Sequence, residues 1–158
     1  MSIVETYGIT SSTQLIELAK KLKFKLNFVG FTDDLELQPT SDGAYIFNIG
    51  DKAGTHWTAG FIKGDTMFYF DSFAVPPEDD LIHILERNSC VRQIIYNSNF
   101  QFQNICENLC GIWCVIFLYH MTHSKLATLT PGGRKRDLGT VLIERFDEFK
   151  KRYKNLQL

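Results

Sequence analysis

The stretch ENLCGIWCVIFLYHM (residues 107–121) indicates what lies at the centre of this fold. From Ile112 to Met121 almost every side chain is apolar, and a helix that is apolar on all sides has to be buried. We therefore predict a buried central helix over about residues 110–123. Its first turn contains Cys110 and Gly111, where the backbone N–H groups and the helix dipole favour an anion such as a thiolate. Gly111 also leaves room for a second backbone to approach.

The rest of the chain predicts helices at both ends and strands between them. Ser11 and Gln14 form a capping-box pattern that begins an amphipathic helix over 12–23. Residues 31–43 are predicted to be loop, Pro76 and Pro77 to open a helix, and 137–154 to form a strong amphipathic helix. Strands are predicted at 24–29, 44–50, 56–63, 66–72 and 91–96. This order indicates an α+β fold with a mainly antiparallel central sheet and helices packed on it, as one domain over residues 1–158.

Charge and composition exclude several classes of protein. The net charge of −1 gives no bulk attraction to nucleic acid or to a membrane. Residues 133–158 nevertheless carry eight Lys/Arg against four Asp/Glu, so this basic segment is either a solvated helix face or a contact for nucleic acid. The first residues have no signal-peptide pattern and the longest apolar run is too short to span a bilayer. We therefore expect an intracellular protein whose four cysteines are thiols.

A cysteine nucleophile requires a base, and the spacing of the four histidines favours His56. His120 and His123 lie two to three turns along the helix of Cys110, about 15–20 Å away at 1.5 Å per residue. His56 starts a predicted strand, and Asp71 ends the strand that follows it across the Gly64–Asp65 turn. Antiparallel neighbours bring such positions together at one edge, so we expect His56 to meet Asp71 there.

Two other interpretations of the cysteines remain open. Cysteine is often simply a buried core residue, and Asp71 can be an ordinary strand-end turn residue. The pattern Cys106-x3-Cys110-x3-Cys114 can also face one way on a helix, although this is not a usual zinc spacing. On either interpretation the chain is a non-enzymatic thiol or metal protein, or a module that binds partners.

The combined motifs resemble the adenovirus-type cysteine endopeptidases and the wider clan that contains the proteases for SUMO and other ubiquitin-like modifiers. The similarity rests on GTHWTAGFIKGDTMFYFDSF (54–73), a glutamine seven residues before Cys110, and CGIWC (110–114). TQLIELAKKLKFKLNFVGFTDD (13–34) is similar to the opening of the adenoviral enzymes. The resemblance covers roughly residues 13–122 and does not extend to the last part of the chain.

This resemblance implies a set of catalytic roles. Cys110 is the nucleophile, His56 the general base and acid, and Asp71 the residue that orients His56. The oxyanion glutamine of the family falls on Gln103, with Gln101 in the same loop as the alternative. The backbone N–H of Cys110 is the second oxyanion donor.

The resemblance also implies a substrate class. Trp57 and Gly111 are expected to line a narrow cleft that accepts small residues, so that cleavage follows short Gly-containing motifs through a thioester. The implied function is cleavage of capsid and core precursor proteins during virion maturation, in a virus, a virophage or a virus-like transposon. An alternative is an isopeptidase or processing protease for a ubiquitin-like modifier.

Activators and location follow from the same resemblance. The chemistry needs no cofactor and no metal, but the adenoviral enzymes use a disulfide-linked peptide and DNA as activators. Cys90 lies in a position comparable to the peptide-linking cysteine, although its spacing to Gln103 differs by two, and the pI of about 6.4 departs from the basic adenoviral pattern. The expected location is the virus factory or nucleus of the host cell and then the virion, without membrane contact.

Overall fold

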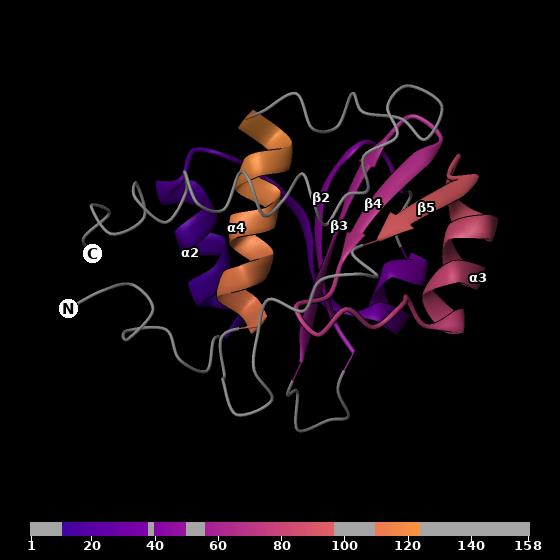
Figure 1. Ribbon diagram of the computed structural model, residues 1–158, viewed down its shortest axis with the longest axis horizontal. Helices are drawn as coiled ribbons and strands as arrows, with labels where there is room; N and C mark the ends of the chain where they lie inside the picture. Colours follow the sequence, from indigo (N-terminus) through magenta and orange to yellow (C-terminus); the bar gives the residue numbers. More distant parts are fainter. Residues whose placement is uncertain (1–10, 38–39, 50–55, 97–109, 124–158) are drawn as a thin grey trace.

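A mixed five-stranded sheet lies between two layers of helices (Figure 1). The computed structural model describes residues 11–37, 40–49, 56–96 and 110–123. Helices α2 and α4 cover one face of the sheet, and α3 lies on the other side (Figure 1). In chain order the elements are α2 (Ser12–Lys21), β1 (Leu26–Phe31), the 3-10 helix η1 (Thr32–Leu37), β2 (Gly43–Asn48), β3 (Trp57–Lys63), β4 (Thr66–Phe70), α3 (Asp79–Asn88), β5 (Gln93–Tyr96) and α4 (Cys110–His123).

The strand order follows the sequence, β1-β2-β3-β4-β5, but the pairing changes along the sheet. The pairs β2–β3 and β3–β4 are antiparallel, whereas the outer pairs β1–β2 and β4–β5 are parallel. The α+β class is confirmed. The sheet is mixed because each parallel outer pair is joined by a crossover connection. The segment containing η1 returns the chain to the start of β2, and α3 does the same for β5.

Alternate residues of the central strands pack into two separate hydrophobic cores, one on each face of the sheet. Ala44, Ile46, Phe68 and Phe70 face the α2–α4 layer, where they pack with Trp57 and the apolar side chains of α4. Tyr45, Phe47, Met67 and Tyr69 face the other layer, where they pack with α3 and η1. Because both faces of β2 and β4 are covered, these strands are apolar without the polar alternation of a half-exposed sheet.

The local signals in the sequence agree with most of these elements. The capping box is present, since Ser11 Oγ accepts from the Gln14 N–H and the Gln14 side chain accepts from the Ser11 N–H. Gly64 has a positive φ of 62° in the hairpin turn between β3 and β4. Helix α3 begins at Asp79 with Glu78 as its N-cap, two residues after the prolines that were expected to open it.

Two predictions about larger segments have different outcomes. The predicted loop 31–43 was wrong in part, because it contains η1, which buries Leu35 against the α3 side of the sheet. The predicted helix 137–154 lies outside the described residues, so the extent of the single domain remains a prediction. Among the described residues, no helix combines the length and apolarity needed to cross a membrane.

We predict that Phe117→Ala lowers the free energy of unfolding by about 3–5 kcal/mol, because it removes a fully buried ring. The Phe117 ring stacks on Phe70 with centroids 5.1 Å apart, and it therefore links α4 to the centre of the sheet. Urea denaturation measures the loss. Phe31→Ala is the matched control, because that ring is 41% exposed on β1 and its removal should cost about 0.5 kcal/mol or less. Equal losses in the two variants would contradict this account of the core.

Candidate active site

Cys110 is the first residue of α4, at the N-terminal end of this buried helix, which packs on β3. The side chain is 7% exposed, and Trp57, Phe70 and Ile112 belong to the same hydrophobic cluster. The first N–H groups of a helix have no carbonyl acceptor in their own helix, so they lie next to the thiol as hydrogen-bond donors. A sulfur anion or an oxyanion at this position therefore meets a positive electrostatic environment.

The β3–β4 hairpin brings His56 and Asp71 together, as the sequence predicted. In this ladder Ala59 pairs with Phe70, so the same register places Asp71 opposite Thr58, close to the start of β3. His56 Nε2 lies 2.9 Å from Asp71 Oδ1. The two side chains are 18% and 2% exposed, which keeps most water away from this hydrogen bond.

His56 also contacts Cys110, and the two contacts together set its protonation. Burial, the largest influence, lowers the pKa of His56, but the hydrogen bonds to Asp71 and Cys110 and the attraction of their charges outweigh it. The pKa of His56 rises from 6.5 to about 9. Because Asp71 accepts a hydrogen bond from Nε2, the other ring nitrogen, Nδ1, is left for the thiol.

Trp57 contributes its backbone to the same site. The Trp57 N–H donates to Cys110 Sγ at 3.4 Å, across 53 residues of sequence. This bond fixes the start of β3 against the start of α4. It also gives the sulfur a hydrogen-bond donor. The indole of Trp57 is buried, at 7% exposure, and packs in the core between α4 and the sheet.

Phe73 is a site residue that the sequence analysis missed. Its ring packs against the imidazole of His56 with the centroids 5.0 Å apart and the planes tilted by 34°. Its backbone N–H donates to Asp71 Oδ1 at 2.8 Å, the same oxygen that binds His56. The only signal in the sequence was its position two residues after Asp71, which becomes meaningful once the turn is known.

Some of the other predicted site residues and cysteines lie within the described residues and some lie outside them. Gly111 is buried beside Cys110 in the first turn of α4, whereas Cys90 is an exposed free thiol just after α3. Gln103, Gln101 and Cys106 lie outside the described residues. Burial raises the pKa of Cys114, which therefore stays a neutral thiol in the core.

The remaining histidines do not reach Cys110, as predicted. His83 lies on the exposed side of α3, 3.7 Å from Glu86, and His123 Nε2 lies 3.1 Å from the Leu22 carbonyl. His120 is buried towards the C-terminal end of α4. Among the described residues, no group of three or more His, Cys, Asp and Glu side chains is arranged to hold a metal ion.

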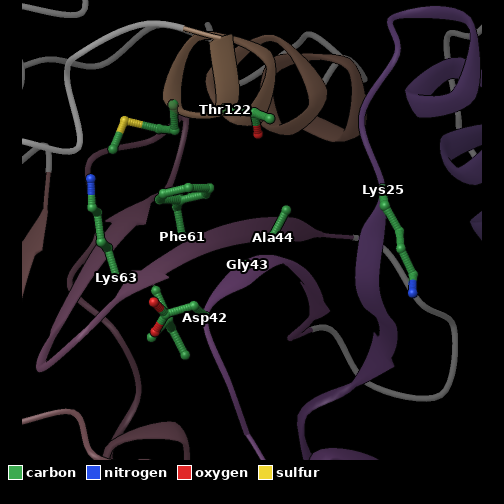
Figure 2. Close-up of a pocket in the computed structure, with 9 residues that line it drawn as sticks. Lys25, Asp42, Gly43, Ala44, Phe61, Lys63 and Thr122 are labelled. Carbon is green, nitrogen blue, oxygen red and sulfur yellow. The ribbon is translucent and has the colours of Figure 1, made fainter.

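A separate hollow of about 470 Å³ lies at the opposite end of the sheet (Figure 2). It is formed by the end of β3, the start of β2 and the last turns of α4, and Met121 is about 16 Å from Cys110 at 1.5 Å per residue. The Asp42 carboxylate accepts the Gly64 N–H at 3.0 Å, so it stabilises the hairpin turn. The lining residues are Lys25, Asp42, Gly43, Ala44, Phe61, Ile62, Lys63, Met121 and Thr122, none of which belongs to the His56–Cys110 site.

Comparison with known proteins finds a similar fold but no similar sequence. No protein-family model and no curated protein matches the chain. Among solved structures, the crystal structure of the ASFV pS273R protease is similar, with a TM-score of 0.53 and 15% identity over 72% of this chain and 57% of that one. Its selenomethionine form aligns with a TM-score of 0.39 and 19% identity over 50% of this chain and 34% of that one. The chain thus has the fold of a solved viral protease and spans about 57% of its length.

We predict that the His56 imidazole titrates near pH 9 and that Asp71→Asn moves its midpoint down towards 6.5, because the amide keeps the shape but removes the charge. NMR of the ring signals against pH measures both midpoints, and His56→Ala identifies the signal. The other histidine signals are the internal control. A wild-type midpoint near 6.5 would contradict the pairing.

The same shift makes the pair's contribution to stability depend on pH. The folded state binds the His56 proton more tightly than the unfolded chain, so this contribution is full below pH 6.5 and is lost as the pH rises through about 9. The difference in unfolding free energy between wild type and Asp71→Asn should therefore be larger at pH 6 than at pH 10.

Proposed function

We propose that this chain is a cysteine endopeptidase with Cys110 as nucleophile, His56 as general base and acid, and Asp71 as the residue that orients His56. The observation that carries the proposal is the contact of one imidazole with both the Asp71 carboxylate and the Cys110 thiol. This is the arrangement that nucleophilic catalysis by cysteine requires: a nucleophile, a base and a group that holds the base. The similar fold of a solved protease supports the same reaction class.

In the first half of the reaction, His56 accepts the proton of the Cys110 thiol, and the Cys110 sulfur attacks the carbonyl carbon of the scissile peptide bond. The tetrahedral intermediate collapses when the C–N bond breaks, and His56 donates its proton to the departing amine. The acyl group remains on Cys110 as a thioester. The raised pKa of His56 suits this step, because the imidazolium is available as an acid at neutral pH.

In the second half, water attacks the thioester while His56, now neutral, accepts a proton from the water. The C–S bond breaks, the acid product leaves, and the sulfur and imidazole return to their starting state. In both halves the carbonyl oxygen becomes an anion next to the start of α4. The Cys110 N–H and Gln103, or Gln101, are the proposed donors to it, each worth about 3 kcal/mol in the transition state.

The proposed substrates are capsid and core precursor proteins cut at Gly-containing sites during virion maturation. This choice rests on the resemblance of the His-Trp, Asp, Gln and Cys-Gly motifs to the adenovirus-type enzymes. Both Trp57 and Gly111 are buried beside Cys110, and their assignment to the wall of a narrow cleft that accepts small residues comes from the same resemblance. The competing proposal is a processing protease for a ubiquitin-like modifier, which shares the triad and differs in the substrate surface.

Activation and location belong to the same proposal. An activating viral peptide linked through Cys90 is compatible with the exposed thiol at that position. Nucleic acid is proposed to contact the basic segment 133–158, and the enzyme is proposed to work in the host's virus factory or nucleus and in the virion. Neither activator takes part in the chemistry at Cys110.

The first prediction of this proposal concerns a reaction that needs no substrate. Limiting iodoacetamide at pH 6 should label Cys110 at least about tenfold faster than Cys90 or Cys114, because Cys110 is the one of these three described thiols that has an imidazole partner. Peptide mass spectrometry locates the adduct. His56→Ala should remove the advantage of Cys110.

Two features of the labelling experiment keep it decisive. Cys114→Ala is the control, since that thiol lies one helical turn further along α4 and is fully buried. Slow labelling spread evenly over the cysteines in wild type, and unchanged in His56→Ala, would reject an activated Cys110 and favour the non-enzymatic module.

Cleavage itself gives the second prediction. Cys110→Ala should abolish cleavage without loss of fold, and His56→Ala should reduce it by about 10³ or more. Two substrates are digested in parallel, with and without virion peptides and DNA. One is a Gly-containing capsid-precursor peptide, and the other is a fusion protein whose ubiquitin-like modifier part terminates in Gly-Gly. Preference for the fusion would replace the maturation proposal with the modifier-protease one. Normal turnover by Cys110→Ala would reject the mechanism.

A further inference from the structure

A tight turn holds the Asp71 carboxylate in place directly after β4. The Ala74 N–H donates to the Asp71 carbonyl at 2.8 Å, and the Phe73 N–H donates to Asp71 Oδ1 at 2.8 Å. The side chain of Asp71 therefore bonds its own backbone two residues on, in an Asx turn. Ser72, inside the turn, is completely buried. These bonds leave the carboxylate little freedom to rotate.

Ala74 makes this turn unusual. Its φ is 62°, in the left-handed region that costs an alanine free energy and that glycine normally occupies. A residue keeps such a conformation only when the surrounding structure imposes it, and these positions cluster at functional sites. Ala74 directly follows Phe73, whose ring lies against His56.

The Phe73 ring does not belong to the cores that stabilise the fold. Among the described residues, it is a member of neither hydrophobic cluster, and its side chain is half-buried. Its ring contact is with the imidazole of His56, with centroids 5.0 Å apart. At this distance the face of an aromatic ring also attracts a cation, and an imidazolium is one.

We propose that Phe73 is a positioning residue of the active site: its N–H fixes the Asp71 oxygen that binds His56, and its ring confines the imidazole between Asp71 and Cys110. This inference rests on the proposed function and deepens it. Without the ring, the imidazole can swing towards solvent and spend less time beside the thiol. Cys110 then loses its partner for part of the time, although the thiol itself is untouched.

The test uses thiol labelling at two pH values in the full chain. At pH 6 fast labelling of a thiol requires a partner that accepts its proton, whereas at pH 9.5 an ordinary thiol ionises without one. Within the part of the chain that the structure describes, the titratable side chains that contact His56 are Asp71, after β4, and Cys110, on α4. We expect Phe73→Ala to slow iodoacetamide labelling of Cys110 at least about fivefold at pH 6 and less than about twofold at pH 9.5.

Two further variants and one control complete the design. Phe73→Tyr keeps the ring and should restore the wild-type rate, and Phe73→Leu keeps apolar bulk without a flat ring and should fall between. Phe61→Ala removes another half-buried phenylalanine at the far end of β3 and should leave both rates unchanged. Circular dichroism checks the fold of each variant. If Phe73→Ala does not fold, the labelling rate of Phe73→Leu is used as the test instead.

The outcomes separate this inference from the proposed function. If wild-type labelling at pH 6 does not depend on His56, the proposed function fails and the role of Phe73 fails with it. If wild type depends on His56 but Phe73→Ala labels at the wild-type rate, only the role of Phe73 is overturned. Equal slowing at pH 6 and pH 9.5 also overturns it, because that result indicates a distorted or blocked thiol.

Discussion

Burial of α4 against the centre of the sheet is the constraint on which the candidate site depends. The helix is apolar on nearly every side, so it is stable only where both the sheet and α2 cover it. That burial leaves its N-terminus at a fixed place, at the end of β3 where Trp57 begins. A thiol on the first residue of such a helix inherits a fixed position, low solvent exposure and a set of N–H donors.

The second constraint is the register of the β3–β4 hairpin. A slip of one residue would turn every side chain of β4 to the other face of the sheet, which both cores forbid. The same register places Asp71 opposite Thr58, two residues after His56, and His56 Nε2 reaches Asp71 Oδ1 at 2.9 Å. Packing of the two faces therefore fixes the geometry of the His56–Asp71 pair, although neither residue is part of a core cluster.

The electrostatics of the site is a competition between burial and pairing. Burial alone would make His56 neutral at physiological pH, since a half-hidden imidazolium loses part of its hydration. The carboxylate on one side and the sulfur on the other reverse this result and favour the charged ring. The Phe73 N–H donates to the same carboxylate oxygen that binds His56.

The sequence by itself determined the local features: the buried helix from 110 to 123, the capping box at Ser11, the hairpin at Gly64 and the candidates Cys110, His56 and Asp71. Each depends on neighbours along the chain or on an antiparallel pairing that a short turn enforces. Tertiary structure alone decided the parallel outer pairs, the burial of η1, the bond from the Trp57 N–H to the thiol and the contact of Phe73 with His56. These features join segments whose sequences carry no signal of each other, because crossover connections and packing between layers bring them together.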